Sequence, residues 1–318
     1  MTNLFNLDID KIRYGGADIK LIKLGGSIIY EIPPLYPLYV PGEFERNEDI
    51  TEVKTTVNET HIDLSYMFYG CTYLNSVNVQ DWDTSNVINM EAMFSGCQLI
   101  TILGDTSNWD TGKVTNMRGM FNGCRYLKTI NGLSNWNTSA VTDMSYMFAS
   151  SGGTSNRFTT LDVSNFDTSN VTDMSSMFAE CTSLSSLDLS NWDTSNVTNM
   201  VNMFYNCRFT NLDLSSFNTS NVTKMTSMFQ NCTKLKTLNL SNFDMSNCTF
   251  SSIQPFCSGC TSLTELRLDN CNNDTISKII NSYNFPDSDI GKERMIYCKR
   301  TNAEGLVAPE NWTFSYID

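Results

Sequence analysis

Apolar residues recur along this chain with a period of 25 to 30 residues over most of its length. One copy runs from Leu184 to Cys207 and reads LSSLDLSNWDTSNVTNMVNMFYNC. Its most regular position is a phenylalanine, replaced by cysteine in the eighth copy, and successive copies lie 26, 27, 27, 30, 26, 25 and 28 residues apart. A period in this range is typical of a solenoid, whose short units stack and bury one continuous core. The eight positions are Phe68, Phe94, Phe121, Phe148, Phe178, Phe204, Phe229 and Cys257.

Each copy predicts a strand, a polar turn and a short helix. Leu187 and Leu189 alternate with Asp188, so a strand here points its leucines inward and its aspartate outward. From Val197 onward, apolar residues at i, i+3, i+6, i+7 and i+10 predict one face of an α-helix. The Asn, Asp, Ser and Thr residues between the two elements are typical helix caps. We also expect one asparagine per turn to stack from coil to coil as an amide ladder, at Asn86, Asn170, Asn196 and Asn221.

The unit LxxLDLSxWDTSNVTxMxxMFxxC resembles the BspA-like leucine-rich repeats of bacterial and protozoan surface proteins, and the match extends from about residue 50 to residue 271. The resemblance implies a right-handed solenoid with a parallel sheet on one face. It also implies roles in adhesion and recognition instead of catalysis. We therefore predict an α/β fold, a leucine-rich repeat solenoid of about eight units.

The sequence divides into four segments. Residues 1–32 predict a small β-unit, residues 33–48 a proline-rich linker, residues 49–271 the solenoid and residues 272–318 a C-terminal cap. The linker holds four of the chain's seven prolines, which favours a stiff, extended connector. A cap is expected because the last coil of a solenoid otherwise exposes its apolar face.

The N-terminal β-unit has two apolar runs around Gly25-Gly26, which predict a β-hairpin, and Gly15-Gly16 predicts a second turn within a three-stranded meander. Its pattern I-K-x-I-x-L-G-x-x-x-I-Y resembles short β-units at the start of bacteriophage tail and other virion proteins. Because so small a unit is marginal alone, we expect it to anchor the chain or to self-associate. A plain cap on the solenoid is the alternative. The expected contact residues are Ile19, Leu21, Ile22, Leu24, Ile28, Ile29 and Tyr30.

The net charge of -13 argues against nucleic acid as a partner, because neutralising phosphates requires a Lys/Arg surface. It also disfavours anionic membrane surfaces. No run of 18 apolar residues is present, so no membrane insertion is predicted. The first ten residues lack the basic and apolar regions of a signal peptide, which disfavours a conventional exported surface protein.

Seven of the eleven cysteines occupy one column of the repeat, the position of a small buried hydrophobe. We prefer free thiols, because the number is odd and Ser151 replaces one member. Disulfides are the alternative, since coils about 5 Å apart bring the cysteines within reach. Cys257 and Cys260 form a CxxC pair near Cys248 and Cys271, so a four-thiolate zinc site is a second alternative. The pair fills core columns, which argues against zinc.

Residues suited to catalysis are scarce. The single histidine, His61, lies outside the best repeats, whereas a Ser/His/Asp or Cys/His system needs a histidine in a cleft. No glycine-rich phosphate loop is present. We therefore predict no enzyme, no catalytic residues and no cofactor.

The candidate binding surface is the outward row of the predicted sheet. Its carboxylates and amides are groups that bind sugars, and clustered carboxylates also bind calcium. A plain solvated face is the alternative. The neighbouring tryptophans, Trp82, Trp109, Trp136 and Trp192, are interpreted as core because phenylalanine replaces them in other copies. The residues of the row, which we call the sheet stripe, are Asn78, Asp162, Asp188, Asp213, Asn239 and Arg267.

Together these features predict a non-enzymatic recognition protein of a bacteriophage virion, such as a tail fibre, spike or head fibre. Its partners would be a host cell-surface glycan or protein and, through the N-terminal β-unit, other virion proteins or further copies of the chain. A bacterial or protozoan surface adhesin, located at the cell surface, is the first alternative. A purely structural virion decoration protein is the second.

Overall fold

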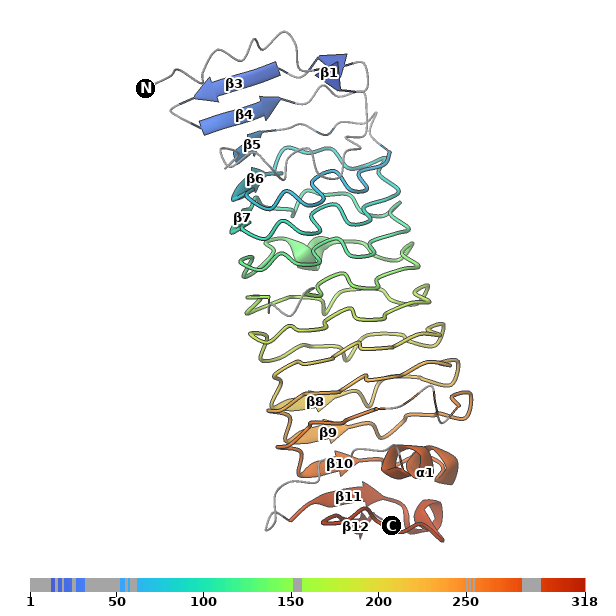
Figure 1. Cartoon of the computed structure of the whole chain (residues 1–318). Helices are drawn as coiled ribbons and strands as arrows, with labels where there is room; N and C mark the ends of the chain where they lie inside the picture. The colour runs from blue at the N-terminus through green and yellow to red at the C-terminus, as the bar shows by residue number, and fades with distance from the viewer. Residues whose placement is uncertain are drawn as a thin grey trace.

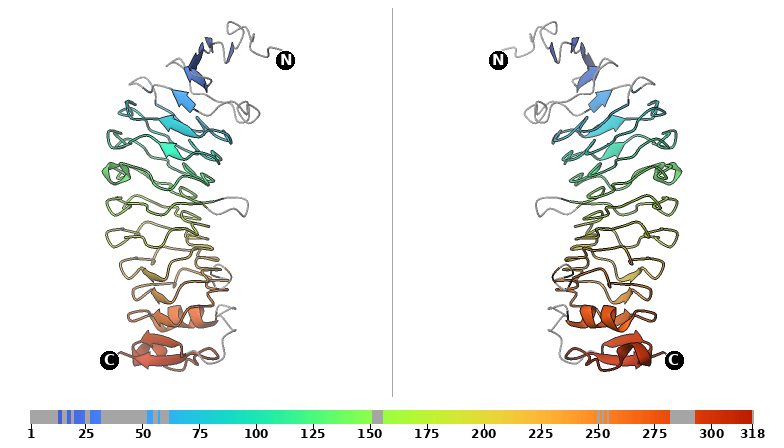
Figure 2. Two further views of the ribbon diagram at one scale, coloured as in Figure 1. Left: turned by 90° about the vertical axis from the view of Figure 1, so that its left-hand side faces the viewer. Right: turned by 90° about the vertical axis from the view of Figure 1, so that its right-hand side faces the viewer.

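The computed structural model describes residues 62–317 apart from 151–155, 250, 252, 254 and 282–292, together with Val57 and the backbone of five short strands before it. From residue 62 the chain winds into coils that stack in one direction (Figure 1). Turning the molecule shows the same stack from both sides, with the C-terminus at the far end (Figure 2). The predicted solenoid of about eight repeats is confirmed.

One side of the coils carries a parallel sheet that is interrupted in the middle of the solenoid (Figure 1). The first part consists of β5 (Glu52–Lys54), β6 (Ser76–Asn78) and β7 (Ile102–Leu103). The second part consists of β8 (Asn211–Asp213), β9 (Thr237–Asn239), β10 (Glu265–Arg267), β11 (Met295–Cys298) and β12 (Thr313–Tyr316). Each strand pairs with the same strand of the next coil, which is the arrangement predicted from the L-x-x-L-x-L pattern.

A second parallel ladder continues through the region where the sheet is interrupted. It consists of single bridges between equivalent residues of successive coils, each one residue before the first methionine of its copy, or before Leu64 in the first copy. Because each bridge joins residues one coil apart, this ladder fixes the register of the stack. Its members are Asp63, Asn89, Asn116, Asp143, Asp173, Asn199 and Lys224.

The helix predicted over each M-x-x-M-F-x-x-C segment is wrong, because the segment is a run of tight turns. In the second coil the amide of Met93 bonds the carbonyl of Met90 at 3.4 Å, three residues back. The amide of Ala92 instead bonds the carbonyl of Arg118 in the next coil at 2.7 Å. Alternate amides thus bond within the coil and between coils, and neither bond is the i→i−4 bond of an α-helix.

In six of the copies two residues adopt a left-handed backbone, four positions apart, which a right-handed helix excludes. In the second coil these are Ala92, with φ 50°, and Gly96, with φ 78°. Apolar residues three positions apart fit consecutive tight turns as well as a helix. Hydrophobic periodicity therefore did not distinguish the two structures. The distinguishing signal is a glycine or asparagine directly before the column cysteine, residues that tolerate positive φ. It is present at Gly70, Gly96, Gly123, Asn206, Asn231 and Gly259.

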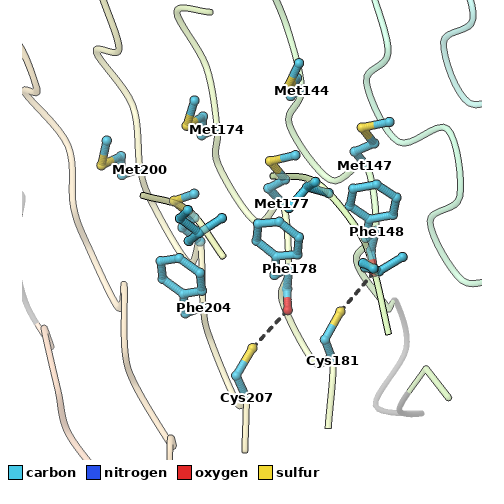
Figure 3. Packing of buried hydrophobic residues seen from close by; sticks show 14 of the residues in the cluster. Met144, Met147, Phe148, Met174, Met177, Phe178, Cys181, Met200, Phe204 and Cys207 are labelled. Atoms are coloured by element: carbon cyan, nitrogen blue, oxygen red, sulfur yellow. Dashed lines mark hydrogen bonds between the residues drawn. The ribbon is translucent and has the colours of Figure 1, made fainter. Parts of the chain in front are cut away.

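The core consists of side-chain columns that run along the stack (Figure 3). The ring of Phe204 lies 5.8 Å from that of Phe178 and 5.7 Å from that of Phe229, with planes within 5° of parallel. The tryptophan column is built alike, with Trp82 and Trp109 5.7 Å apart. Each of these rings contacts rings of neighbouring coils, so a single coil cannot bury its apolar side chains without its neighbours.

A buried threonine in six of the copies joins one coil to the next by hydrogen bonds. The Oγ1 of Thr194 donates to the carbonyl of Asn218 and accepts from the amide of Asn218, both at 2.9 Å. The Thr194 side chain is 1% exposed. Equivalent hydroxyls donate to the next coil from Thr84, Thr111, Thr138, Thr168 and Thr219.

We expect Thr194→Val to lower the free energy of unfolding by about 1–3 kcal/mol, because it removes both hydrogen bonds between the buried Thr194 hydroxyl and the backbone of Asn218. Urea denaturation measures the change. The control is Thr198→Val, whose hydroxyl lies on the exposed surface and bonds the carbonyl of Thr172, and it should change stability by about 0.5 kcal/mol or less. Equal effects of the two variants would contradict this role for the buried threonines.

The predicted asparagine ladder exists in a different form. The Nδ2 groups of Asn196 and Asn221 donate to the backbone carbonyls of Ser169 and Ser195 in the preceding coils, at 2.6 and 2.7 Å. Asn170 makes the same contact. An amide that bonds a carbonyl satisfies the backbone as well as the side chain, so amide-to-carbonyl contacts replace the expected amide-to-amide stack.

At the N-terminal end, β3 (Lys20–Leu24) pairs antiparallel with β4 (Ser27–Glu31), which confirms the hairpin predicted around Gly25-Gly26. β1 (Arg13–Tyr14) pairs with β2 (Ala17–Asp18). These strands form two separate two-stranded sheets instead of the predicted meander. Six of the seven expected contact residues lie on β3 and β4, but their side chains are outside the described part of the chain, as is the linker at 33–48.

At the C-terminal end, α1 (Asn273–Asn281) follows the last full repeat, and the Oδ1 of Asn272 caps it by accepting from the amide of Thr275 at 2.8 Å. Ile276, Ile279 and Ile280 on one side of α1 are buried. Two short 3₁₀ turns, Leu133–Asn135 and Arg300–Ala303, complete the elements described here. The sheet continues past the repeats into β11 and β12, so the end segment adds two more parallel strands to the stack.

Candidate recognition surface

The structure brings half of the sheet stripe into direct register. Asp213 pairs with Asn239, and Asn239 with Arg267, on the adjacent strands β8, β9 and β10. Asp162 and Asp188 are exposed in the preceding coils, outside the assigned strands. The C-terminal coils therefore carry a continuous polar row that includes one positive charge, Arg267.

Asn78 is separated from the rest of the stripe. It lies on β6, and the neighbouring residue in the next coil is Gly104, which has no side chain to continue the row. A Cβ at Gly104 would lie 2.9 Å from the Oδ1 of Asn78, so the asparagine occupies that space. Asn78 is therefore not part of a continuous surface with the aspartates.

Each acidic or amide side chain of the stripe closes a local turn. The Oδ1 of Asp188 accepts from the amide of Ser190 at 3.1 Å and from its hydroxyl at 2.7 Å. Asp213 accepts from the amide of Ser215 at 2.9 Å, and Asn239 repeats the pattern with Ser241. One oxygen is thus committed to the backbone, and the groups are held in fixed directions.

These contacts lower the pKa of two carboxylates of the stripe, Asp188 and Asp213. The hydroxyl and amide of Ser190 lower the pKa of Asp188. Partial burial raises the pKa of Asp213, but hydrogen bonds from Ser215 and Asn239 and the charge of Arg267 outweigh burial, and the net shift is downward. Asp188 and Asp213 therefore present negative charge throughout the physiological pH range.

The row extends beyond the residues that the sequence indicated. Arg267 pairs with Tyr297 of β11, and Tyr297 pairs with Ser315 of β12. The guanidinium of Arg267 lies over the Tyr297 ring, 5.1 Å from its centroid, and its Nε donates to the Oδ2 of Asp269 at 3.2 Å. In the sequence, β11 and β12 are marked only by their alternating apolar residues. The repeat pattern that located the stripe ends before both strands, so the sequence did not predict this extension.

The aromatic residues beside the stripe belong to the core. Trp82, Trp109, Trp136 and Trp192 are at most 3% exposed, which confirms the core interpretation. The indole N–H of Trp192 donates to the carbonyl of Val163 at 3.0 Å, so its polar edge is also satisfied. These rings are unavailable as platforms for a sugar.

The column cysteines are buried thiols that donate to backbone carbonyls (Figure 3). The Sγ of Cys207 bonds the carbonyl of Phe178 at 3.0 Å, and that of Cys181 bonds the carbonyl of Phe148 at 3.2 Å. Burial raises the pKa of both thiols, and the bond needs the protonated form. This arrangement supports the free-thiol interpretation.

We expect stability to decrease above pH 9. An unfolded thiol ionises near pH 9, whereas the folded thiol stays protonated to higher pH, so alkali favours the unfolded chain. Each buried thiol lowers the free energy of unfolding by up to about 1.4 kcal/mol per pH unit above that point. Denaturation midpoints between about pH 7.5 and pH 10.5 test this. Cys207→Ala removes one thiol and should reduce the slope, and an unchanged slope would contradict the assignment.

Neither the zinc nor the calcium alternative gains support from the geometry. Among the residues that the structure describes, no group of three or more His, Cys, Asp or Glu side chains is placed to hold a metal ion. The thiols of Cys260 and Cys271 bond two different carbonyls, of Phe229 and Leu240. His61 lies outside the described residues. Every helix within the described ranges is too short or too polar to cross a membrane.

Comparison with known proteins places the repeats in a family. A family model described as "Mycoplasma protein of unknown function, DUF285" matches residues 62–156 and 151–266. None of the curated proteins compared with the chain matches it.

Several solved structures resemble the chain weakly. A leucine-rich repeat protein of T. pallidum is 13% identical, with a TM-score of 0.23, over 85% of this chain and 88% of its own. A leucine-rich cell surface protein of Faecalibacterium prausnitzii is 17% identical, with a TM-score of 0.23, over 87% and 98%. A Leptospira interrogans leucine-rich repeat protein is 10% identical, with a TM-score of 0.23, over 87% and 88%. These scores carry no argument about this chain, whose fold is established by its own strand pairing.

Proposed function

Because this chain belongs to the DUF285 family of Mycoplasma proteins, for which no function is described, we propose a function from its surface: non-enzymatic recognition at a cell surface. The observation that carries the proposal is the register of Asp213, Asn239 and Arg267 on the outward face of the sheet, where Asp213 is exposed and the other two are half-buried. Hydrogen bonds fix the directions of these side chains, so the face presents an ordered row of donors and acceptors. Such rows suit a glycan or a protein surface.

A cellular surface protein is favoured over a virion component. The family description refers to Mycoplasma proteins, whereas the virion prediction depends on a short motif at residues 19–30 whose side chains lie outside the described part of the chain. Within this proposal, the N-terminal β-unit attaches the solenoid to another protein or to a second copy. The solenoid then holds its sheet face away from that attachment point.

Binding of the labelled full chain to intact bacterial and epithelial cells tests the proposal. We expect saturable binding, reduced at least about tenfold in the triple variant Asp162→Asn/Asp188→Asn/Asp213→Asn. Asparagine keeps the oxygen that closes each turn, so the unfolding midpoint should stay in place.

The matched control is Asp83→Asn/Asp110→Asn/Asp193→Asn, which removes the same charge from equivalent turns on another column. It should bind like the unmodified chain. Absence of saturable binding to every cell type would overturn a recognition role. Equal loss in both triple variants would overturn the assignment to the sheet stripe.

A further inference from the structure

Positive charge is concentrated on one edge of this acidic solenoid. The edge is the turn that joins each column cysteine to the following strand, at the start of the strands in Figure 1. Between residues 62 and 266 the chain has nine Lys and Arg residues and sixteen Asp and Glu residues. Six of those nine cations lie on this edge, with a single acidic residue, Glu265. We call the six the basic edge: Arg125, Lys128, Arg157, Arg208, Lys234 and Lys236.

Backbone hydrogen bonds align these cations along the solenoid axis. The amide of Arg157 bonds the carbonyl of Arg125 at 3.0 Å, which places the two arginines on neighbouring coils. The amide of Lys236 bonds the carbonyl of Thr210 at 2.7 Å, and Thr264 bonds Lys236 in turn at 2.9 Å. With coils about 4.8 Å apart, the basic edge spans roughly 20 Å from the third coil to the seventh, with no cation on the fifth.

The cations of the basic edge have no counter-ions among the described residues. The ion pairs within that part of the chain involve Arg118, Arg267 and Lys278 instead. Five of the six edge residues are exposed, and the sixth, Arg125, is half-buried, with an Nε that has no hydrogen-bond partner there. Arg157 lies over the Tyr126 ring, 4.3 Å from its centroid, which holds its charge at the surface. The chain therefore leaves a line of positive charge unneutralised.

We propose that the basic edge binds a linear anionic polysaccharide lying along the solenoid axis. Four of the five coils from the third to the seventh carry one or two cations, and the fifth carries only hydroxyls on this edge. Together with hydroxyls such as Thr159 and Thr210, these cations match a single chain that bears carboxylates or sulfates and many hydroxyls. The aspartates of the sheet stripe lie farther along the same coils and confine an anionic chain to the edge. This site is separate from the sheet stripe and stands independently of the function proposed for it.

A protein or a nucleic acid fits the basic edge less well. A protein interface needs aromatic or aliphatic anchors, and the exposed large apolar residues described on this edge are confined to the first three coils, at Tyr73, Leu99, Ile102 and Tyr126. Single-stranded nucleic acid binds by stacking on aromatic rings, but Arg157 already covers the Tyr126 ring. Duplex DNA carries one charge per about 1.7 Å, a density that one line of cations does not match.

Equilibrium binding of the full chain to polygalacturonate at low and at physiological salt tests the proposal. Neutral dextran and a thymidine oligonucleotide serve as comparison ligands. We expect polygalacturonate binding that weakens with salt, no dextran binding and weaker oligonucleotide binding. Lys234→Gln/Lys236→Gln should weaken polygalacturonate binding at least about tenfold. The matched control, Lys113→Gln/Lys224→Gln, removes the same charge from exposed lysines off the edge and should have little effect.

The outcomes separate this proposal from the recognition role of the sheet stripe. Asp162→Asn/Asp188→Asn/Asp213→Asn should retain or strengthen polygalacturonate binding, because it removes negative charge beside the edge. Absence of polygalacturonate binding, equal loss in both lysine variants, or tighter binding of the oligonucleotide would overturn the proposal. If cells bind through the stripe while polygalacturonate does not bind at all, the edge proposal fails and the recognition role stands.

Discussion

Replacing Phe204 with alanine is expected to lower the free energy of unfolding by about 3–5 kcal/mol. The ring is fully buried in a central coil and stacks on Phe178 and Phe229, at 5.8 and 5.7 Å. The change removes apolar contacts to two coils at once, and the cavity cannot collapse without disturbing both neighbours. Chemical denaturation followed by circular dichroism measures the loss.

The control for Phe204 is Phe204→Leu, which keeps most of the buried volume and should cost less than about 1.5 kcal/mol. If alanine and leucine reduced stability equally, the stacked phenylalanine column would not be what joins the coils. A loss below about 1 kcal/mol for alanine would also contradict the core described here.

Gly132→Ala is expected to destabilise the chain by roughly 2–5 kcal/mol. Gly132 has φ 84°, and a Cβ there would overlap the backbone nitrogen of Ser107 and lie 2.7 Å from its Cα. The left-handed backbone makes a side chain unfavourable, and the close approach of two coils leaves no room for one. Thermal or urea denaturation of the purified variant measures the effect.

Gly305→Ala separates the two expected causes of destabilisation at Gly132, the left-handed backbone and the contact with Ser107. Gly305 has φ 76°, but nothing lies within 4 Å of the position that a Cβ would take. This variant has the cost of the left-handed backbone alone, roughly 1–2 kcal/mol. Equal destabilisation at Gly132 and Gly305 would show that contact with Ser107 contributes nothing.

The columns of the core could be read from the sequence because stacking repeats one side-chain environment in every coil. Phe204 and Cys207 were placed correctly for this reason. The local backbone could not be derived in the same way, since apolar residues three apart fit a helix and a run of turns equally. Only positive φ at positions such as Asn206 distinguishes them, and asparagine tolerates that conformation without requiring it.

The surface was less predictable than the core. Alternation in each strand showed that Asp188 and Asp213 point outward, but the interruption at Gly104 and the extension to Tyr297 depend on how coils outside the regular pattern stack. The basic edge was hidden because net charge averages over the molecule. Lys236 and Asp213 lie in adjacent coils, and each of these coils holds charges of both signs. The opposite charges separate only when residues are grouped by their column along the stack.

Carboxyl footprinting of the full chain on cell envelopes tests the recognition role most directly. The measurement compares labelling of Asp162, Asp188 and Asp213 with labelling of Asp83, Asp110 and Asp193, which close equivalent turns on another column. Recognition through the sheet stripe predicts protection of the first set, with the second set labelled as in the free chain. Equal labelling of both sets in the bound and free chain, or protection of the second set alone, would contradict it.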